Sequence, residues 1–73
     1  MPCSTRLIRQ VFEQAQLAEQ FNALLARERE AAQHYAAMAD QVDDSELRKQ
    51  VLQLHGEKKR HVRLARRLLE IVD

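Results

Sequence analysis

The sequence predicts an all-α protein that consists of one long antiparallel helical hairpin. Apolar residues recur at alternating spacings of three and four positions over two stretches, which is the heptad pattern of packed helices. A short polar turn that contains Asp43 and Asp44 separates the two stretches. The chain has one glycine and one proline, so little in either stretch interrupts a helix.

The first helix is expected over residues 4–41. Ser4 is its expected N-cap, because a serine hydroxyl accepts a hydrogen bond from an unpaired amide of the first turn. The apolar pattern weakens near Gln14 and Gln16, which leaves open a kink or break at that point. The heptad positions of this helix are Phe21, Leu24, Glu28, Ala31, Tyr35, Met38 and Val42.

The second helix is expected over residues 45–72. Asp43 with Glu46 three positions later matches a capping box, and Asp44 is the alternative cap. The arginine-rich end of this helix suits the negative pole of the helix dipole. Its heptad positions are Leu47, Val51, Leu54, Lys58, His61, Ala65, Leu68 and Val72.

The polar heptad residues fall at similar levels when the hairpin closes. Pairing Val42 with Leu47 across the turn sets Glu28 level with His61, and Lys58 one layer away. We therefore expect these three residues to form a buried polar layer inside an otherwise apolar seam.

The chain is expected to be a single domain, residues 1–73, that assembles with copies of itself. A chain of this length buries too little surface to be very stable alone, and its apolar faces are broad enough for four helices. We expect a homodimer or a higher even homo-oligomer. The residues expected between chains are Leu25, Ala32, Ala39, Val62 and Leu69.

The first helix is expected to extend about ten residues beyond the end of the second. This N-terminal arm has nothing to pack against in a single hairpin, so we expect it to contact a neighbouring chain. Its apolar residues are Leu7, Ile8, Val11 and Phe12.

Composition favours a cytoplasmic protein without a membrane role. Cys3 is the only cysteine, the formal net charge is +1, and no apolar run approaches the roughly 20 residues of a membrane span. The second helix has a basic outer face, which we expect to be solvated and paired with acidic neighbours rather than to bind nucleic acid. This basic face consists of Lys59, Arg60, Arg63, Arg66 and Arg67.

Three segments resemble a known family: Arg-Glu-Arg-Glu-Ala-Ala-Gln-His-Tyr at 27–35, Asp-Ser-Glu-Leu at 44–47, and Glu-Lys-Lys-Arg-His at 57–61. Over residues 23–69 the chain resembles the ferritin-like carboxylate proteins, most closely rubrerythrin-type sequences and the two-helix encapsulated ferritins. The resemblance implies that two hairpins form a four-helix bundle around a pair of iron ions. Each hairpin of that family supplies a Glu from one helix and a Glu-x-x-His from the other.

By that resemblance, Glu28 matches the first-helix ligand, His61 matches the histidine, and Tyr35 matches an aromatic residue further along. Lys58 occupies the remaining ligand position, and a protonated lysine has no lone pair to give a metal. The implied function is a ferritin-like oligomer with a degenerate iron site and weak or absent ferroxidase activity. The lysine favours a protein that is not an enzyme.

The sequence leaves three interpretations of the polar layer open. In the first, iron or another divalent metal such as zinc binds through Glu28 and His61 of two chains, with Glu57 as a further ligand. In the second, Lys58 pairs with Glu28, and His61 completes a network in a structural or interaction module. In the third, Glu28 and Lys58 extend to solvent and the layer has no function.

Two further features lie outside the heptad positions. Glu30 and His34 are four residues apart, which suits a secondary cation site but is also the spacing of an ordinary surface pair.

Gly56 lies in the interior of the second expected helix, where glycine destabilises a helix by about 1 kcal/mol relative to alanine. That cost suggests a close approach by another backbone at Gly56, such as the arm of a neighbouring chain.

Overall fold

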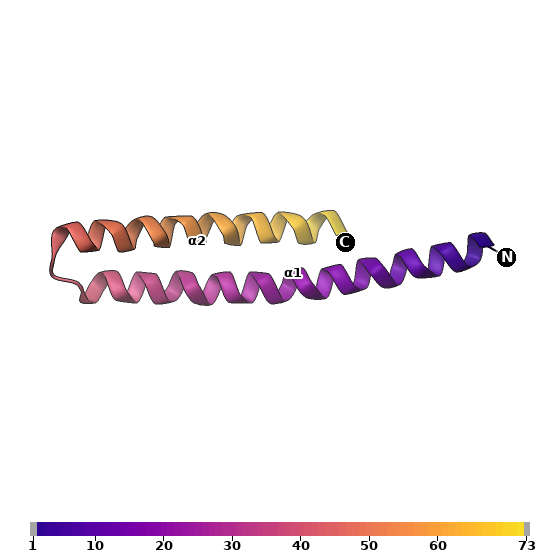
Figure 1. Cartoon of the computed structure of the whole chain (residues 1–73), viewed down its shortest axis with the longest axis horizontal. Helices are drawn as coiled ribbons and strands as arrows, with labels where there is room; N and C mark the ends of the chain where they lie inside the picture. The colour runs from indigo at the N-terminus through magenta and orange to yellow at the C-terminus, as the bar shows by residue number, and fades with distance from the viewer. Residues whose placement is uncertain (1, 73) are drawn as a thin grey trace.

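Two helices and one short turn make up the structure. The computed structural model describes the backbone of residues 2–72 and the side chains of residues 11–72. Helix α1 spans Pro2–Gln41, helix α2 spans Ser45–Val72, and residues 42–44 join them (Figure 1). The helices contain 40 and 28 residues and run antiparallel, which confirms the predicted all-α helical hairpin.

Helix α1 is continuous. It begins at Pro2, earlier than the expected cap at Ser4, and the fixed φ angle of proline suits the first turn of a helix. Gln14 and Gln16 lie within one helix, so the break that the sequence left open at this point is absent. Glutamine forms helices well, and a weak apolar pattern alone does not end one.

The turn is held by hydrogen bonds at both helix ends. Asp44 Oδ1 accepts from the Leu47 amide at 2.9 Å, and the Asp44 carbonyl accepts from the Arg48 amide at 2.9 Å. Asp44 is therefore the N-cap of α2, and the expected cap at Asp43 is wrong. Arg48 Nε donates to the Ala39 carbonyl at 3.1 Å, which pairs an acceptor that the last turn of α1 leaves free.

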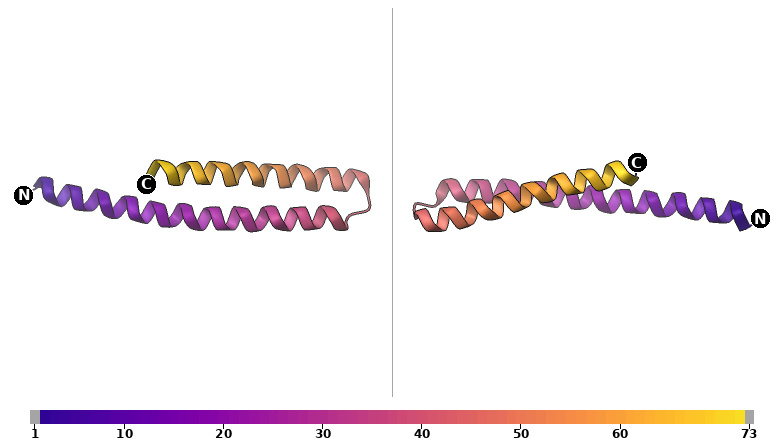
Figure 2. Two further views of the ribbon diagram at one scale, coloured as in Figure 1. Left: turned by 180° about the vertical axis from the view of Figure 1, so that it is seen from behind. Right: turned by 90° about the horizontal axis from the view of Figure 1, so that it is seen from above.

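The molecule is a thin rod with an N-terminal arm. Its extents are 66 × 13 × 13 Å, and α1 continues well past the C-terminal end of α2 (Figure 1). The helices lie side by side in one view and cross at a shallow angle in the perpendicular view (Figure 2). Val11 and Phe12 of the arm are 64% and 65% exposed, whereas the side chains of Leu7, Ile8 and Cys3 lie outside the described part.

The contact between the helices follows one heptad pattern, which we call the inner seam. Its members are buried or half-buried and recur at spacings of three and four. On α1 they are Ala18, Phe21, Leu25, Glu28, Ala32, Tyr35 and Ala39, followed by Val42 in the turn, and on α2 they are Val51, His55, Lys58, Val62, Ala65, Leu69 and Val72.

About half of the residues in the inner seam are not among the heptad positions that the sequence predicted. Leu25 and Ala39, expected between chains, are buried within this chain at 9% and 5% exposure. Ala32, Val62 and Leu69 are half-buried in this chain, and their contact with other chains stays a prediction. The expected seam residues that are exposed instead are Leu24, Met38, Leu47, Leu54 and Leu68.

Side-chain size explains why the helices pack on this flank. Apolar columns with the same seven-residue spacing lie on both sides of the column that contains Phe21, Glu28 and Tyr35. The column that faces α2 includes Ala32 and Ala39, whose small side chains let the helices approach closely. The bulkier alternative column is left on the surface.

The single hairpin has little core of its own. Its buried apolar residues are two alanines, one leucine and one valine, and no large side chain among the described residues is fully buried. Neither helix offers, over its described residues, an apolar stretch long enough to cross a membrane.

Candidate functional site

The three polar residues of the expected layer meet between the two helices. Lys58 Nζ lies 3.2 Å from Glu28 Oε2, and His61 Nδ1 lies 3.4 Å from the same oxygen. Lys58 and His61 are three residues apart, so helical geometry places both on the side of α2 that borders Glu28. Glu28 belongs to the inner seam of α1, which directs its carboxylate toward α2.

The layer is half-buried rather than buried. The side chains of Glu28, Lys58 and His61 are 15%, 28% and 43% exposed, and no polar residue among the described ones is fully buried. The expectation of a buried layer is therefore wrong for a single chain, because one flank of the layer has no covering helix. In such a setting the net value of the ion pair is about 1 kcal/mol or less.

The chemistry of these side chains does not fit the pair of iron ions that the family resemblance implies. Glu28 and His61 supply two donor groups, and the Lys58 ammonium occupies one of the carboxylate oxygens. Glu57 is exposed and lies outside this cluster. No group of three His, Cys, Asp or Glu side chains within the described residues is arranged to hold a metal.

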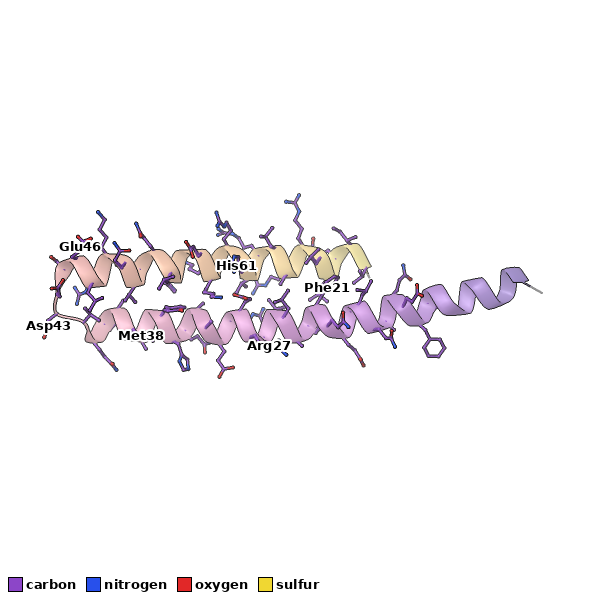
Figure 3. All side chains as sticks on the ribbon, in the orientation of Figure 1. Phe21, Arg27, Met38, Asp43, Glu46 and His61 are labelled. Atoms are coloured by element: carbon purple, nitrogen blue, oxygen red, sulfur yellow. The ribbon has the colours of Figure 1, made fainter. Side chains whose placement is uncertain are left out.

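A hollow of about 290 Å³ adjoins the ionic cluster on the uncovered side. Leu24 and Glu28 of α1 and His61, Leu64 and Leu68 of α2 line it. His61 lies about midway along α2, far from Asp43 and Glu46 at the turn (Figure 3). The hollow shows that one side of the hairpin presents leucine side chains from both helices next to the cluster.

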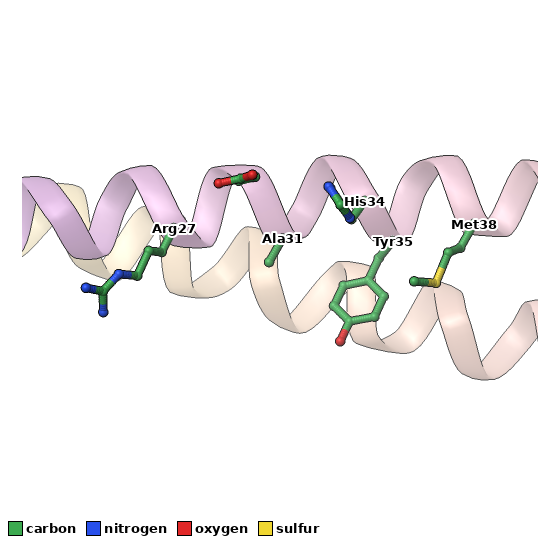
Figure 4. Close-up of a pocket in the computed structure, with 6 residues that line it drawn as sticks. Arg27, Ala31, His34, Tyr35 and Met38 are labelled. Carbon is green, nitrogen blue, oxygen red and sulfur yellow. The ribbon is translucent and has the colours of Figure 1, made fainter.

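A second hollow of about 340 Å³ lies along α1 and includes Tyr35, Glu30 and His34. Arg27, Ala31, Tyr35 and Met38 project from the same edge of the helix (Figure 4). Tyr35 is half-buried, whereas Glu30 and His34 are exposed and no described hydrogen bond or ion pair joins them. The secondary cation site at Glu30 and His34 stays a prediction.

The basic face lies on the outside of α2. All five of its residues are exposed, and none makes an ion pair within the described part of the chain. The pairing with acidic neighbours that we expected is therefore absent there.

A shallow hollow of about 520 Å³ includes Gly56, Arg60 and Arg63, and a Cβ placed on Gly56 would meet nothing within 4 Å.

The sequence did not identify Arg48 as a residue that links the two helices at the turn. Its guanidinium reaches the Ala39 carbonyl only because the turn sets the start of α2 beside the end of α1. An arginine three to four residues after a turn was the available signal, but arginine is common on helix surfaces.

The fold and the cluster define a helical hairpin with an ionic site between its helices. No protein-family model, no curated protein and no solved structure matches this chain.

Proposed function

We propose that this chain is a non-enzymatic structural or interaction module with a ferritin-like architecture. In this proposal, the cluster of Glu28, Lys58 and His61 stands where the family that the sequence resembles places a metal centre. The module acts as a homodimer or a higher even homo-oligomer, and its ferroxidase activity is weak or absent.

One observation carries the proposal: a single carboxylate oxygen, Oε2 of Glu28, contacts both the Lys58 ammonium at 3.2 Å and the His61 ring at 3.4 Å. A cation that bound Oε2 of Glu28 would have to displace the ammonium from that oxygen. A cation at Oε1 would still lie within a few ångströms of a like charge, which opposes binding. The same contacts tie the C-terminal half of α1 to the middle of α2 and favour one alignment of the helices.

Metal binding by variants of Lys58 tests the proposal. Lys58→Glu restores the Glu-x-x-His spacing with His61, so we expect it to gain iron. The wild type should retain little or no iron after gel filtration. The measurement is the metal content of purified protein after anaerobic addition of ferrous iron, followed by absorbance during exposure to air.

Two control variants separate ligand chemistry from charge. Lys58→Met removes the ammonium without adding a ligand, and Lys59→Glu adds a carboxylate at an exposed neighbouring position; neither should gain iron. If the wild type takes up two iron ions per pair of hairpins, the proposal is wrong. If Lys58→Glu gains no iron, the likeness to the carboxylate family is misleading.

A further inference from the structure

The side of the hairpin next to the ionic cluster carries a largely apolar surface that His61 interrupts, which we call the open face. Seven-residue spacing places its residues in one column on each helix. Its leucine and methionine side chains are 37% to 54% exposed. The columns are Leu17, Leu24, Ala31 and Met38 on α1, and Leu47, Leu54, His61 and Leu68 on α2.

Both columns border the same side of the molecule. The hollow of about 290 Å³ draws its lining from both: Leu24 of the α1 column, and His61 and Leu68 of the α2 column. When two antiparallel helices pack through corresponding heptad positions, the residues that flank those positions on each helix lie on the same side of the pair. The open face therefore forms one surface that spans both helices.

The chain exposes more surface than a compact monomer of its mass, which leaves area for a partner to cover. A compact monomer of 8.5 kDa exposes about 4,700 Å², whereas this chain exposes 6167 Å². The excess is roughly 1,500 Å², and one partner in a standard interface buries about 800 Å². A single interface partner can account for a large part of this excess.

The charges that border the open face select the partner. The ionic cluster lies near the middle of both columns, with leucine or methionine toward each end. A purely apolar partner would remove water from Glu28 and Lys58 without offering hydrogen bonds, which is costly. A second copy brings one carboxylate and one ammonium to the same level, because a two-fold axis through the cluster sets cluster against cluster.

Glu28 retains the capacity for such a contact. Both described contacts of its carboxylate use Oε2, and Oε1 makes no hydrogen bond or ion pair with any described residue. An ionised carboxylate accepts several hydrogen bonds, so Oε1 is free to accept from Lys58 or His61 of a second copy. The ionic cluster would then extend across both chains.

We propose that a second copy of this chain docks on the open face and that Glu28 of each copy pairs with Lys58 or His61 of the other. The inference rests on the proposed assembly into homodimers and adds the face and the ionic contact between chains. The leucine columns close around this ionic layer and supply the core that one hairpin lacks.

Charge reversal tests the contact between chains. Glu28→Lys leaves two lysines in each cluster, and Lys58→Glu leaves two glutamates, so each variant alone should associate at least about tenfold more weakly than the wild type. An equimolar mixture should form heterodimers, because opposite charges then meet across the interface. Sedimentation equilibrium at micromolar concentration measures this, with a chelator to exclude metal and a reductant to keep Cys3 from crosslinking.

Two leucines on α2 provide a matched test of the face itself. Leu54 is 40% exposed and belongs to the open face, whereas Leu52 is 49% exposed and lies outside it. Leu54→Glu should weaken the dimer by about tenfold or more, and Leu52→Glu should leave it unchanged. Circular dichroism of both variants checks that the helices remain.

Several outcomes would overturn the inference. They are a monomeric wild type, equal effects of Leu54→Glu and Leu52→Glu, and a mixture of charge variants that associates no better than its components. Because the chelator removes metal, these results do not depend on the iron test. Iron uptake by the wild type would contradict the proposed function while leaving the interface result in place.

Discussion

Glu28 and Lys58 form an ion pair of 3.2 Å that joins the C-terminal half of α1 to the middle of α2. His61 contacts the same carboxylate oxygen from the next turn of α2. Because both partners of the ion pair are partly exposed, its main effect is to favour one alignment of the helices rather than to add much stability.

A double-mutant cycle measures the strength of this pair. We expect Glu28→Gln and Lys58→Met to be coupled by about 1 kcal/mol or less in urea unfolding of dilute protein. The coupling should increase at concentrations where a second copy covers the cluster and excludes water. Lys59→Met, at an exposed position, should change stability by less than about 0.5 kcal/mol. Zero coupling at every concentration would contradict the role of the pair.

Alanine substitutions of Asp43 and Asp44 test which of the two aspartates caps α2. Asp44→Ala should lower the free energy of unfolding by about 1 kcal/mol, because the Leu47 amide loses its acceptor. Asp43→Ala should change stability by less than about 0.5 kcal/mol, because Asp43 is exposed and makes no described hydrogen bond. Urea unfolding of the two variants under identical conditions decides the matter. A larger effect at Asp43 would place the cap there instead.

Gly56 offers a site for stabilisation. It is exposed, its φ angle is not positive, and a Cβ would meet nothing within 4 Å. Gly56→Ala should therefore raise the free energy of unfolding by about 1 kcal/mol, and Ala37→Gly at an exposed position of α1 should lower it by a similar amount. If Gly56→Ala instead weakens self-association, another chain packs closely against this part of α2.

Truncation tests the N-terminal arm. Removal of residues 1–15 should leave the hairpin helical by circular dichroism, because the contacts between α1 and α2 remain. Self-association should weaken, since the exposed Val11 and Phe12 are lost. Phe12→Ala should reproduce part of the effect and Glu13→Ala none. Unchanged self-association of the truncated chain would show that the arm makes no contact between chains.

The sequence was sufficient to predict the hairpin, its turn and the residues of the ionic cluster. Heptad spacing fixes which residues share a helix face, and the acidic turn fixes where the chain reverses. Because Glu28, Lys58 and His61 occupy heptad positions at similar distances from that turn, their proximity followed from counting.

The sequence could not decide which flank of each heptad faces the other helix. Leu24 and Leu25 are equally apolar and adjacent, and each belongs to a column with seven-residue spacing. The choice depends on how closely two backbones approach, and the packed flank carries alanines at 18, 32 and 39, whereas the other flank carries one alanine, at 31. Only the folded hairpin shows that Leu25 is buried and Leu24 exposed.

The sequence by itself thus determined the helices, their antiparallel order and the members of the ionic cluster, because local periodicity specifies each of these. The tertiary structure decided the cap at Asp44, the bond from Arg48 to Ala39, and the half-buried state of Glu28. The Arg48 bond and the exposure of Glu28 depend on the rotation of one helix about its axis relative to the other, whereas the cap depends on the backbone conformation of the turn. Periodicity leaves that rotation free, and side-chain packing between the helices sets it.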